Sequence, residues 1–124
     1  MKTERPVYLS LTRFSWPIAA LSSITHRVTG VLLFVAPAYL LWLLGTAVAS
    51  PAGFDEAVAT MNAPLAKLAM IAVLAVLAFH IFAGFKHLVM DFHHWDSLEA
   101  GQRSSISVFV LTVIATILAG VWIW

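Results

Sequence analysis

Three long runs without a charged residue alternate with short polar segments along this chain. The runs cover residues 28–49, 68–85 and 104–124. A helix of ~20 apolar residues crosses the ~30 Å hydrocarbon core of a bilayer, whereas an open strand leaves its backbone groups unsatisfied there. The pattern therefore predicts an all-α membrane protein with three transmembrane helices, which span about residues 24–49, 65–90 and 104–124.

Basic residues gather on one side of these predicted spans. The loop at residues 50–66 carries Asp55 and Glu56 but no Lys or Arg, while the N-terminal segment and the second loop are basic. The basic residues concerned are Lys2, Arg5, Arg13, Arg27, Lys86 and Arg103. Because positive loops stay in the cytoplasm, we expect a cytoplasmic N-terminus, with residues 1–22 as a cytoplasmic segment, and an external C-terminus. Residues 47–49 resemble a signal-peptidase site, but the preceding apolar run is too long, so we expect no cleavage and a single domain over residues 1–124.

Composition supports a membrane environment and excludes several kinds of site. Of 124 residues, 61% are hydrophobic and 10% are charged, against roughly half and a quarter in soluble domains. The absence of cysteine means that this chain supplies no disulfide, thiolate zinc site or iron–sulfur cluster. A net charge of +1 does not fit a nucleic-acid-binding protein, so no nucleic-acid partner is expected.

The first polar cluster lies at the cytoplasmic entrance to the first span. Ser23, His26, Arg27 and Gly30 fall on one stripe of a helix, at positions i, i+3, i+4 and i+7. A hydroxyl, an imidazole and a guanidinium beside a glycine suit a ligand that carries carbonyl or carboxylate oxygens. The alternative is that Arg27 extends to the lipid headgroups and Ser23 hydrogen-bonds its own helix.

The second cluster contains two histidines of the second span. His80 and His87 lie two helical turns apart, ~10.5 Å along the axis, which is too far for both to ligate one iron. His80 lies ~7.5 Å inside the cytoplasmic boundary among apolar and small side chains, which suits a macrocycle, whereas His87 lies near the headgroups. Haem ligation by His80, a hydrogen bond across the bundle and a proton relay remain the interpretations at this point. His93 and His94 are adjacent and indicate a solvated loop rather than a metal site.

The two clusters together resemble a known family. The segment SITHRVTG at residues 23–30 and the pattern H-x3-G-x-K-H-x3-D at residues 80–91 are similar to the two signature segments of the cytochrome b subunit of succinate dehydrogenase. Arg5-Pro6, the Leu-Gly-Thr at residues 44–46 and the Glu-Ala-Gly at residues 99–101 fit as well. The resemblance covers nearly the whole chain and implies a membrane-anchor subunit.

The resemblance implies a role for each matching residue. His80 corresponds to the axial ligand of haem b, and His26 and Arg27 to residues that hold a haem propionate. Ser23 and Arg27 correspond to residues that line the ubiquinone pocket, and His87 to a position near the haem. The sequence departs from the family at Lys86, where many relatives have arginine, and a lysine makes no bidentate contact to a carboxylate.

One deep histidine also implies a partner. A haem with two axial histidines would need its second ligand from another chain, and in the resembling family this is the smaller membrane anchor subunit. A flavoprotein and an iron–sulfur subunit dock on the cytoplasmic face, and the complex passes electrons from succinate to ubiquinone in the bacterial cytoplasmic membrane. This chain would not be catalytic alone.

Three other functions are weighed against this one. The chain is alternatively the anchor of a quinol:fumarate reductase, or a structural membrane anchor without haem. A small transporter is disfavoured, because no carboxylate lies within the three spans.

Overall fold

The computed structural model describes residues 15–95 and 97–124, which form four helices and no strand. The helices are α1 (Ile18–Ala49), α2 (Pro51–Asn62), α3 (Pro64–Asp91) and α4 (Leu98–Ile123). Helices α1, α3 and α4 are each long and apolar enough to cross a membrane, which confirms the predicted all-α protein with three membrane helices. The basic residues at positions 2, 5 and 13, the Arg5-Pro6 pair and Asp96 lie outside the described residues.

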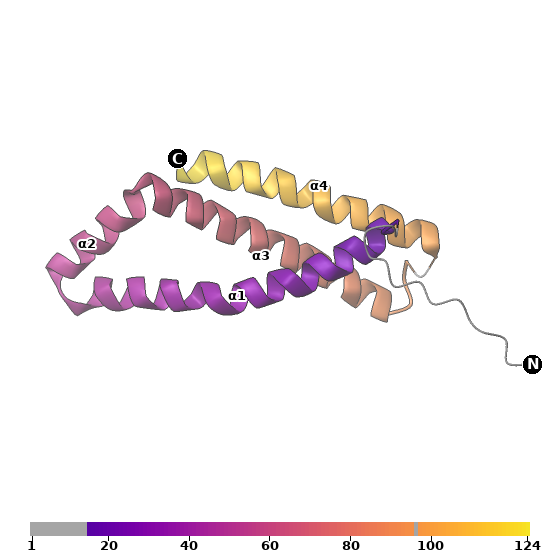
Figure 1. Cartoon of the computed structure of the whole chain (residues 1–124), viewed down its shortest axis with the longest axis horizontal. Coiled ribbons are helices and arrows are strands. Elements are labelled where there is room, and N and C mark those ends of the chain that lie inside the picture. The colour runs from indigo at the N-terminus through magenta and orange to yellow at the C-terminus, as the bar shows by residue number, and fades with distance from the viewer. Residues whose placement is uncertain (1–14, 96) are drawn as a thin grey trace, which may run out of the picture.

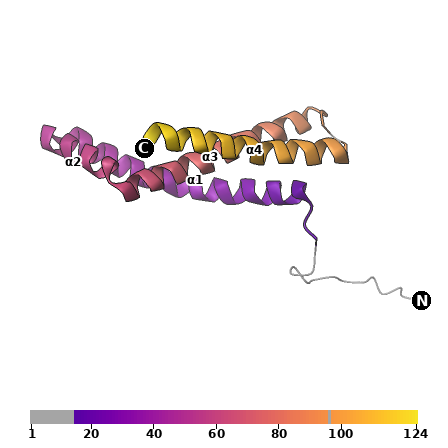
Figure 2. The same ribbon diagram turned by 90° about the horizontal axis from the view of Figure 1, so that it is seen from above.

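Helices α1, α3 and α4 run side by side along the long axis of the molecule, and α3 packs against both of the others (Figures 1 and 2). The start of α1, the end of α3 and the start of α4 lie at one end of the bundle. Helix α2 and the C-terminus lie towards the other end. Arg27, Lys86 and Arg103 therefore share one end of the bundle, which we call the basic end; the side of the membrane that it faces stays a prediction.

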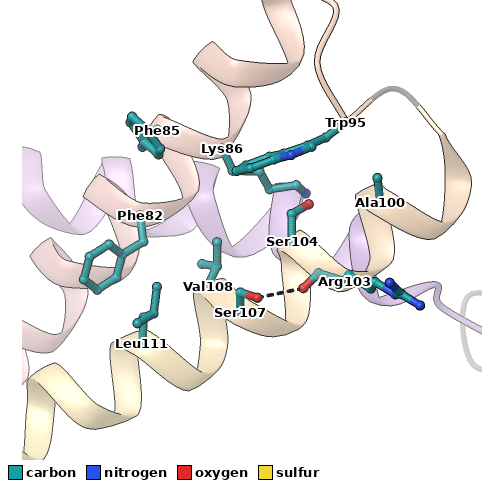
Figure 3. A pocket seen from close by; sticks show the side chains of 10 residues that line it. All are labelled: Phe82, Phe85, Lys86, Trp95, Ala100, Arg103, Ser104, Ser107, Val108 and Leu111. Atoms are coloured by element: carbon teal, nitrogen blue, oxygen red, sulfur yellow. Dashed lines mark hydrogen bonds between the residues drawn. The ribbon is translucent and has the colours of Figure 1, made fainter.

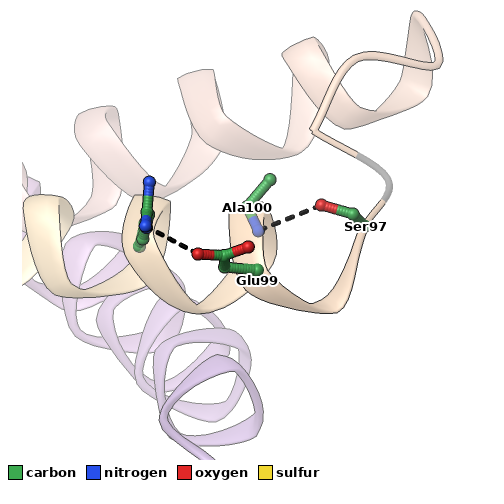
Figure 4. Close-up of polar contacts among 4 residues, drawn as sticks. Ser97, Glu99 and Ala100 are labelled. Carbon is green, nitrogen blue, oxygen red and sulfur yellow. Dashed lines mark hydrogen bonds and ion pairs between the residues drawn. The ribbon is translucent and has the colours of Figure 1, made fainter.

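Capping residues and prolines mark where α2, α3 and α4 begin, and the pattern of apolar residues does not reveal them. Helix α2 lies where the sequence pattern predicts only a loop, and it begins with Ser50, whose hydroxyl accepts a 3.0 Å hydrogen bond from the Gly53 amide. Proline occupies the first turn of both α2 and α3, where its missing N–H costs nothing. Helix α4 begins at Leu98, ahead of its apolar run, because Ser97 caps it through a 3.2 Å bond from the Ala100 amide (Figure 4).

Very little side-chain surface is buried inside this chain. The core is a small cluster of Phe79 and Ala83 from α3 and Val108 from α4, against which Phe82 and Phe109 pack. Most of the apolar surface faces outwards; Phe34, for example, is 88% exposed. In a bilayer that surface contacts lipid or other membrane helices, so the bundle does not need a large core of its own.

Candidate functional site

Three histidines from two helices meet near the basic end of the bundle. The ring of His26 on α1 stacks on that of His80 on α3, with centroids 4.1 Å apart and 20° between the planes. The His26 ring also contacts the ring of His87, which lies two helical turns after His80 on α3. The two centroids are 5.1 Å apart, with 50° between the ring planes. We call His26, His80 and His87 the imidazole cluster; all three side chains are half-buried.

Hydrogen bonds fix which nitrogen of His80 carries its proton. His80 Nδ1 lies 3.1 Å from the backbone carbonyl oxygen of His26 and 3.0 Å from Thr29 Oγ1. A carbonyl oxygen only accepts, so Nδ1 is the donor. Thr29 in turn donates its hydroxyl proton to the same His26 carbonyl at 2.8 Å, which leaves its oxygen free to accept from Nδ1. Nε2 of His80 is therefore the nitrogen with a lone pair.

This arrangement has the chemistry of a metal-ligating histidine. Such a histidine commonly donates its other ring N–H to a backbone carbonyl, which fixes the ring and makes the ligating nitrogen more basic. Among the described residues, no group of three His, Cys, Asp or Glu side chains is arranged to hold a bare metal ion. One available imidazole nitrogen instead fits a metal that brings its own in-plane ligands, as iron in a macrocycle does.

The remaining predicted site residues lie on α1 beside this cluster. Arg27 is exposed and lies close enough to His87 for their charges to interact. Ser23 is half-buried, one helical turn before Arg27 on the same helix face. The structure thus brings His26, His80 and His87 together, with Arg27 near His87, and it places Ser23 on the adjoining turn of α1.

Comparison with known proteins assigns the family. A family model for the succinate dehydrogenase/fumarate reductase transmembrane subunit matches residues 1–119. The chain belongs to this family. It is 42% identical over 125 residues to the succinate dehydrogenase cytochrome b556 subunit of Coxiella burnetii, with 100% of both chains covered. It is 29% identical over 115 residues to the subunit of the same name from Paracoccus denitrificans, covering 93% of this chain and 88% of the relative.

These findings confirm the resemblance to a succinate dehydrogenase cytochrome b subunit. The chain is thus a multi-pass membrane protein and a membrane-anchor cytochrome b subunit of the succinate dehydrogenase/fumarate reductase family. Subunits of this kind work within a complex in the lipid bilayer, so the exposed apolar faces of α1, α3 and α4 lie against lipid or against other subunits.

Lys86, for which the resemblance leads to an expectation of arginine, extends from α3 towards α4. Its side chain is 3% exposed, and Nζ donates a 2.7 Å hydrogen bond to Ser105 Oγ on α4. Ser105 in turn donates to the Gly101 carbonyl oxygen at 2.7 Å. Lys86 therefore links α3 to α4.

Lys86 also lines a cavity of about 380 Å³ between α3 and α4. Apolar side chains such as Phe82 and Leu111 form its walls, and the Trp95 indole lies across its Lys86 end (Figure 3). Neither Ser23 nor any residue of α1 lines this cavity. It is therefore separate from the imidazole cluster and from the predicted quinone-binding residues.

The sequence analysis missed two hydroxyl groups that hold site residues in this chain. Thr29 is 5% exposed and holds His80, and Ser105 is fully buried and holds Lys86. Both are hydroxyls inside an apolar helix, where a polar group needs a partner; this was the available signal.

His94 is exposed in the loop after α3, and its Nδ1 donates to the Phe92 carbonyl oxygen at 2.7 Å.

Proposed function

We propose that this chain binds one haem b through His80 and, with a smaller partner anchor subunit, forms a site at which ubiquinone is reduced by electrons from succinate. The hydrogen bond from His80 Nδ1 to the His26 carbonyl oxygen carries the haem part of this proposal, because it leaves Nε2 as the free ligating nitrogen. The cytochrome b556 names of the two relatives point the same way. Haem, when bound, supplies a one-electron redox centre.

The geometry of the imidazole cluster favours a second axial ligand from a partner chain. Two histidines that held one iron would each have to point a ring nitrogen at it from bonding distance, ~2 Å. The His26 and His80 rings instead lie face to face, 4.1 Å apart. The most apolar stretch of α1 also has no buried residue within this chain, so a partner helix has a face to pack on.

A guanidinium and an imidazole at the basic end suit the carboxylate of a propionate, the first as a cation and the second as a hydrogen-bond donor. His26 and Arg27 are adjacent on α1, and a guanidinium binds a carboxylate through two parallel hydrogen bonds. The His87 ring contacts the His26 ring, so His87 would help to orient that imidazole. His80 would hold haem b, and Arg27, with His26 beside it on α1, would bind a propionate.

Ser23 and Arg27 provide the polar groups for a quinone. Reduction of a quinone to a quinol adds two electrons and two protons, and negative charge develops on the ring oxygens as electrons arrive. The Ser23 hydroxyl donates a hydrogen bond to one quinone oxygen, and the Arg27 guanidinium stabilises the developing charge. Protons enter from water at the basic end, and electrons enter from iron–sulfur and flavoprotein subunits that oxidise succinate. We place the complex in a bacterial cytoplasmic membrane, which is consistent with the bacterial origin of the two relatives.

Haem ligation is tested on the complex purified in mild detergent. The wild-type complex should show a b-type optical spectrum, and His80→Leu should abolish or grossly alter it. His94→Leu, in the exposed loop after α3, is the matched control and should leave the spectrum unchanged. A wild-type complex without b-type absorption, or a His80→Leu spectrum identical to wild type, would overturn the haem assignment.

The quinone role is tested by separating two activities of the same complex. Arg27→Leu should impair ubiquinone reduction while succinate oxidation with a soluble dye acceptor continues. Arg103→Leu removes another exposed arginine at the same end of the bundle, one that is ion-paired with Glu99, and should preserve both activities. Equal loss of both activities in Arg27→Leu would show a general defect in assembly and contradict the quinone role.

A further inference from the structure

The two helices that carry the imidazole cluster share a reciprocal pattern, His-x3-Gly. On α1 it is His26 and Gly30, and on α3 it is His80 and Gly84. Because α1 and α3 run antiparallel (Figure 1), the histidine of each helix lies over the glycine of the other. A Cβ atom placed on Gly30 would lie 3.2 Å from His80 Cε1, and one placed on Gly84 would lie 3.5 Å from His26 Nε2.

The two glycines are not equally constrained. A contact of 3.2 Å is tighter than ordinary van der Waals contact, so a methyl group at Gly30 would displace the His80 ring by a few tenths of an ångström. A contact of 3.5 Å is an ordinary one, so a methyl group at Gly84 would fit beside His26. Gly45, further along α1, has nothing within 4 Å of its added Cβ. The close approach therefore distinguishes Gly30 from the other two.

The His80 ring has little freedom to give way. One face lies against the His26 ring at 4.1 Å, and Nδ1 is held by the His26 carbonyl oxygen and Thr29. The atom nearest to Gly30, Cε1, is bonded to both ring nitrogens. A push on Cε1 therefore either lengthens the Nδ1 hydrogen bonds or turns the direction in which Nε2 points.

We propose that Gly30 is a positioning residue that sets the direction of His80 Nε2, and so the orientation of the axial imidazole on the haem iron. This inference rests on the proposed haem function. It gives a specific reason for glycine at position 30, where alanine would otherwise be the better helix former. Gly84 accommodates His26 without the same demand.

The test compares Gly30→Ala with Gly84→Ala and Gly45→Ala in the purified complex. Gly30→Ala should retain haem but shift the largest g value of the low-spin ferric haem in electron paramagnetic resonance, together with the haem midpoint potential. Both controls should match wild type in both measurements. A Gly30→Ala complex with full haem content and wild-type values would overturn the inference. Absence of haem from wild type would instead overturn the proposed function.

A second pair of variants covers failure of Gly30→Ala to assemble. If the cause is contact with the His80 ring, removing that ring relieves it, so Gly30→Ala/His80→Ala should assemble as well as His80→Ala alone. If the double variant fails where His80→Ala assembles, Gly30 serves helix packing and the inference is wrong.

Discussion

Thr29→Val should weaken haem binding and leave the helix bundle assembled. Valine has nearly the shape of threonine, so the substitution leaves no cavity, but it removes the hydroxyl that lies 3.0 Å from His80 Nδ1 and donates to the His26 carbonyl oxygen at 2.8 Å. At 5% exposure, the site gives water little room to replace the hydroxyl. The His80 ring then keeps only its bond to the His26 carbonyl oxygen.

Loss of a partner that orients a ligating histidine typically costs 10–100-fold in metal affinity, or ~1.4–2.7 kcal/mol at ~1.4 kcal/mol per tenfold change. Because the 3.1 Å bond to the His26 carbonyl oxygen remains, we expect the lower end, about tenfold. A less basic imidazole stabilises ferric iron less, so the haem midpoint potential should also rise.

The assay is haem loss from the purified complex to an excess of a haem-scavenging apoprotein, followed optically, with a redox titration of the same samples. Thr29→Ser keeps the hydroxyl and should behave as wild type. Thr112→Val removes a hydroxyl that bonds only the Val108 carbonyl of its own helix, and should lose haem at the wild-type rate. If both valine variants lose haem equally fast, the effect is one of general stability, and the orienting role of Thr29 is refuted.

Three further predictions concern stability and topology. Ser105→Ala should lower the free energy of unfolding by ~1–3 kcal/mol, because the buried ammonium of Lys86 loses its hydrogen-bond partner. Lys86→Met removes the buried charge as well and should be neutral or stabilising. Equal thermal midpoints for Ser105→Ala and wild type in detergent would contradict this. Ser97→Ala should cost ~1 kcal/mol of local stability by removing the cap of α4, seen as faster hydrogen exchange in its first turn only. The chain has no cysteine, so a single introduced one reports its own location. Glu56→Cys, in the segment predicted to be external, should react with an impermeant thiol reagent in intact cells. Glu99→Cys should react only after permeabilisation, and the reverse pattern would contradict the predicted orientation.

The membrane helices were predictable because their signal is long and continuous. Apolar residues persist through each span, and an open strand would leave its backbone groups unsatisfied in lipid. The elements at the membrane surface carry a different signal. Helix α2 and the first turn of α4 are less apolar than the spans, and Ser50 and Ser97 cap them. In α4, Glu99 also pairs with Arg103 at 2.6 Å. A search for apolar runs does not detect such starts.

The candidate site was predictable as a set of residues but not as an arrangement. His80 stands out because it is a titratable group deep in an apolar run. That His26 stacks on it, and that Thr29 bonds its Nδ1, depends on the register between α1 and α3. Register between two apolar helices is set by the packing of side chains along the whole contact, so the spacing within either helix does not determine it.

Under the proposed haem function, the hydrogen bonds of His80 also give a reason for this chain to need a partner. Both hydrogen bonds of its ring to the described residues use Nδ1, which leaves Nε2 available to a partner outside them. An unsatisfied polar group in the membrane interior costs free energy, and a bound iron or a partner chain removes that cost. Because the proposed haem would be held by this chain and its partner together, haem binding and subunit assembly should stabilise each other.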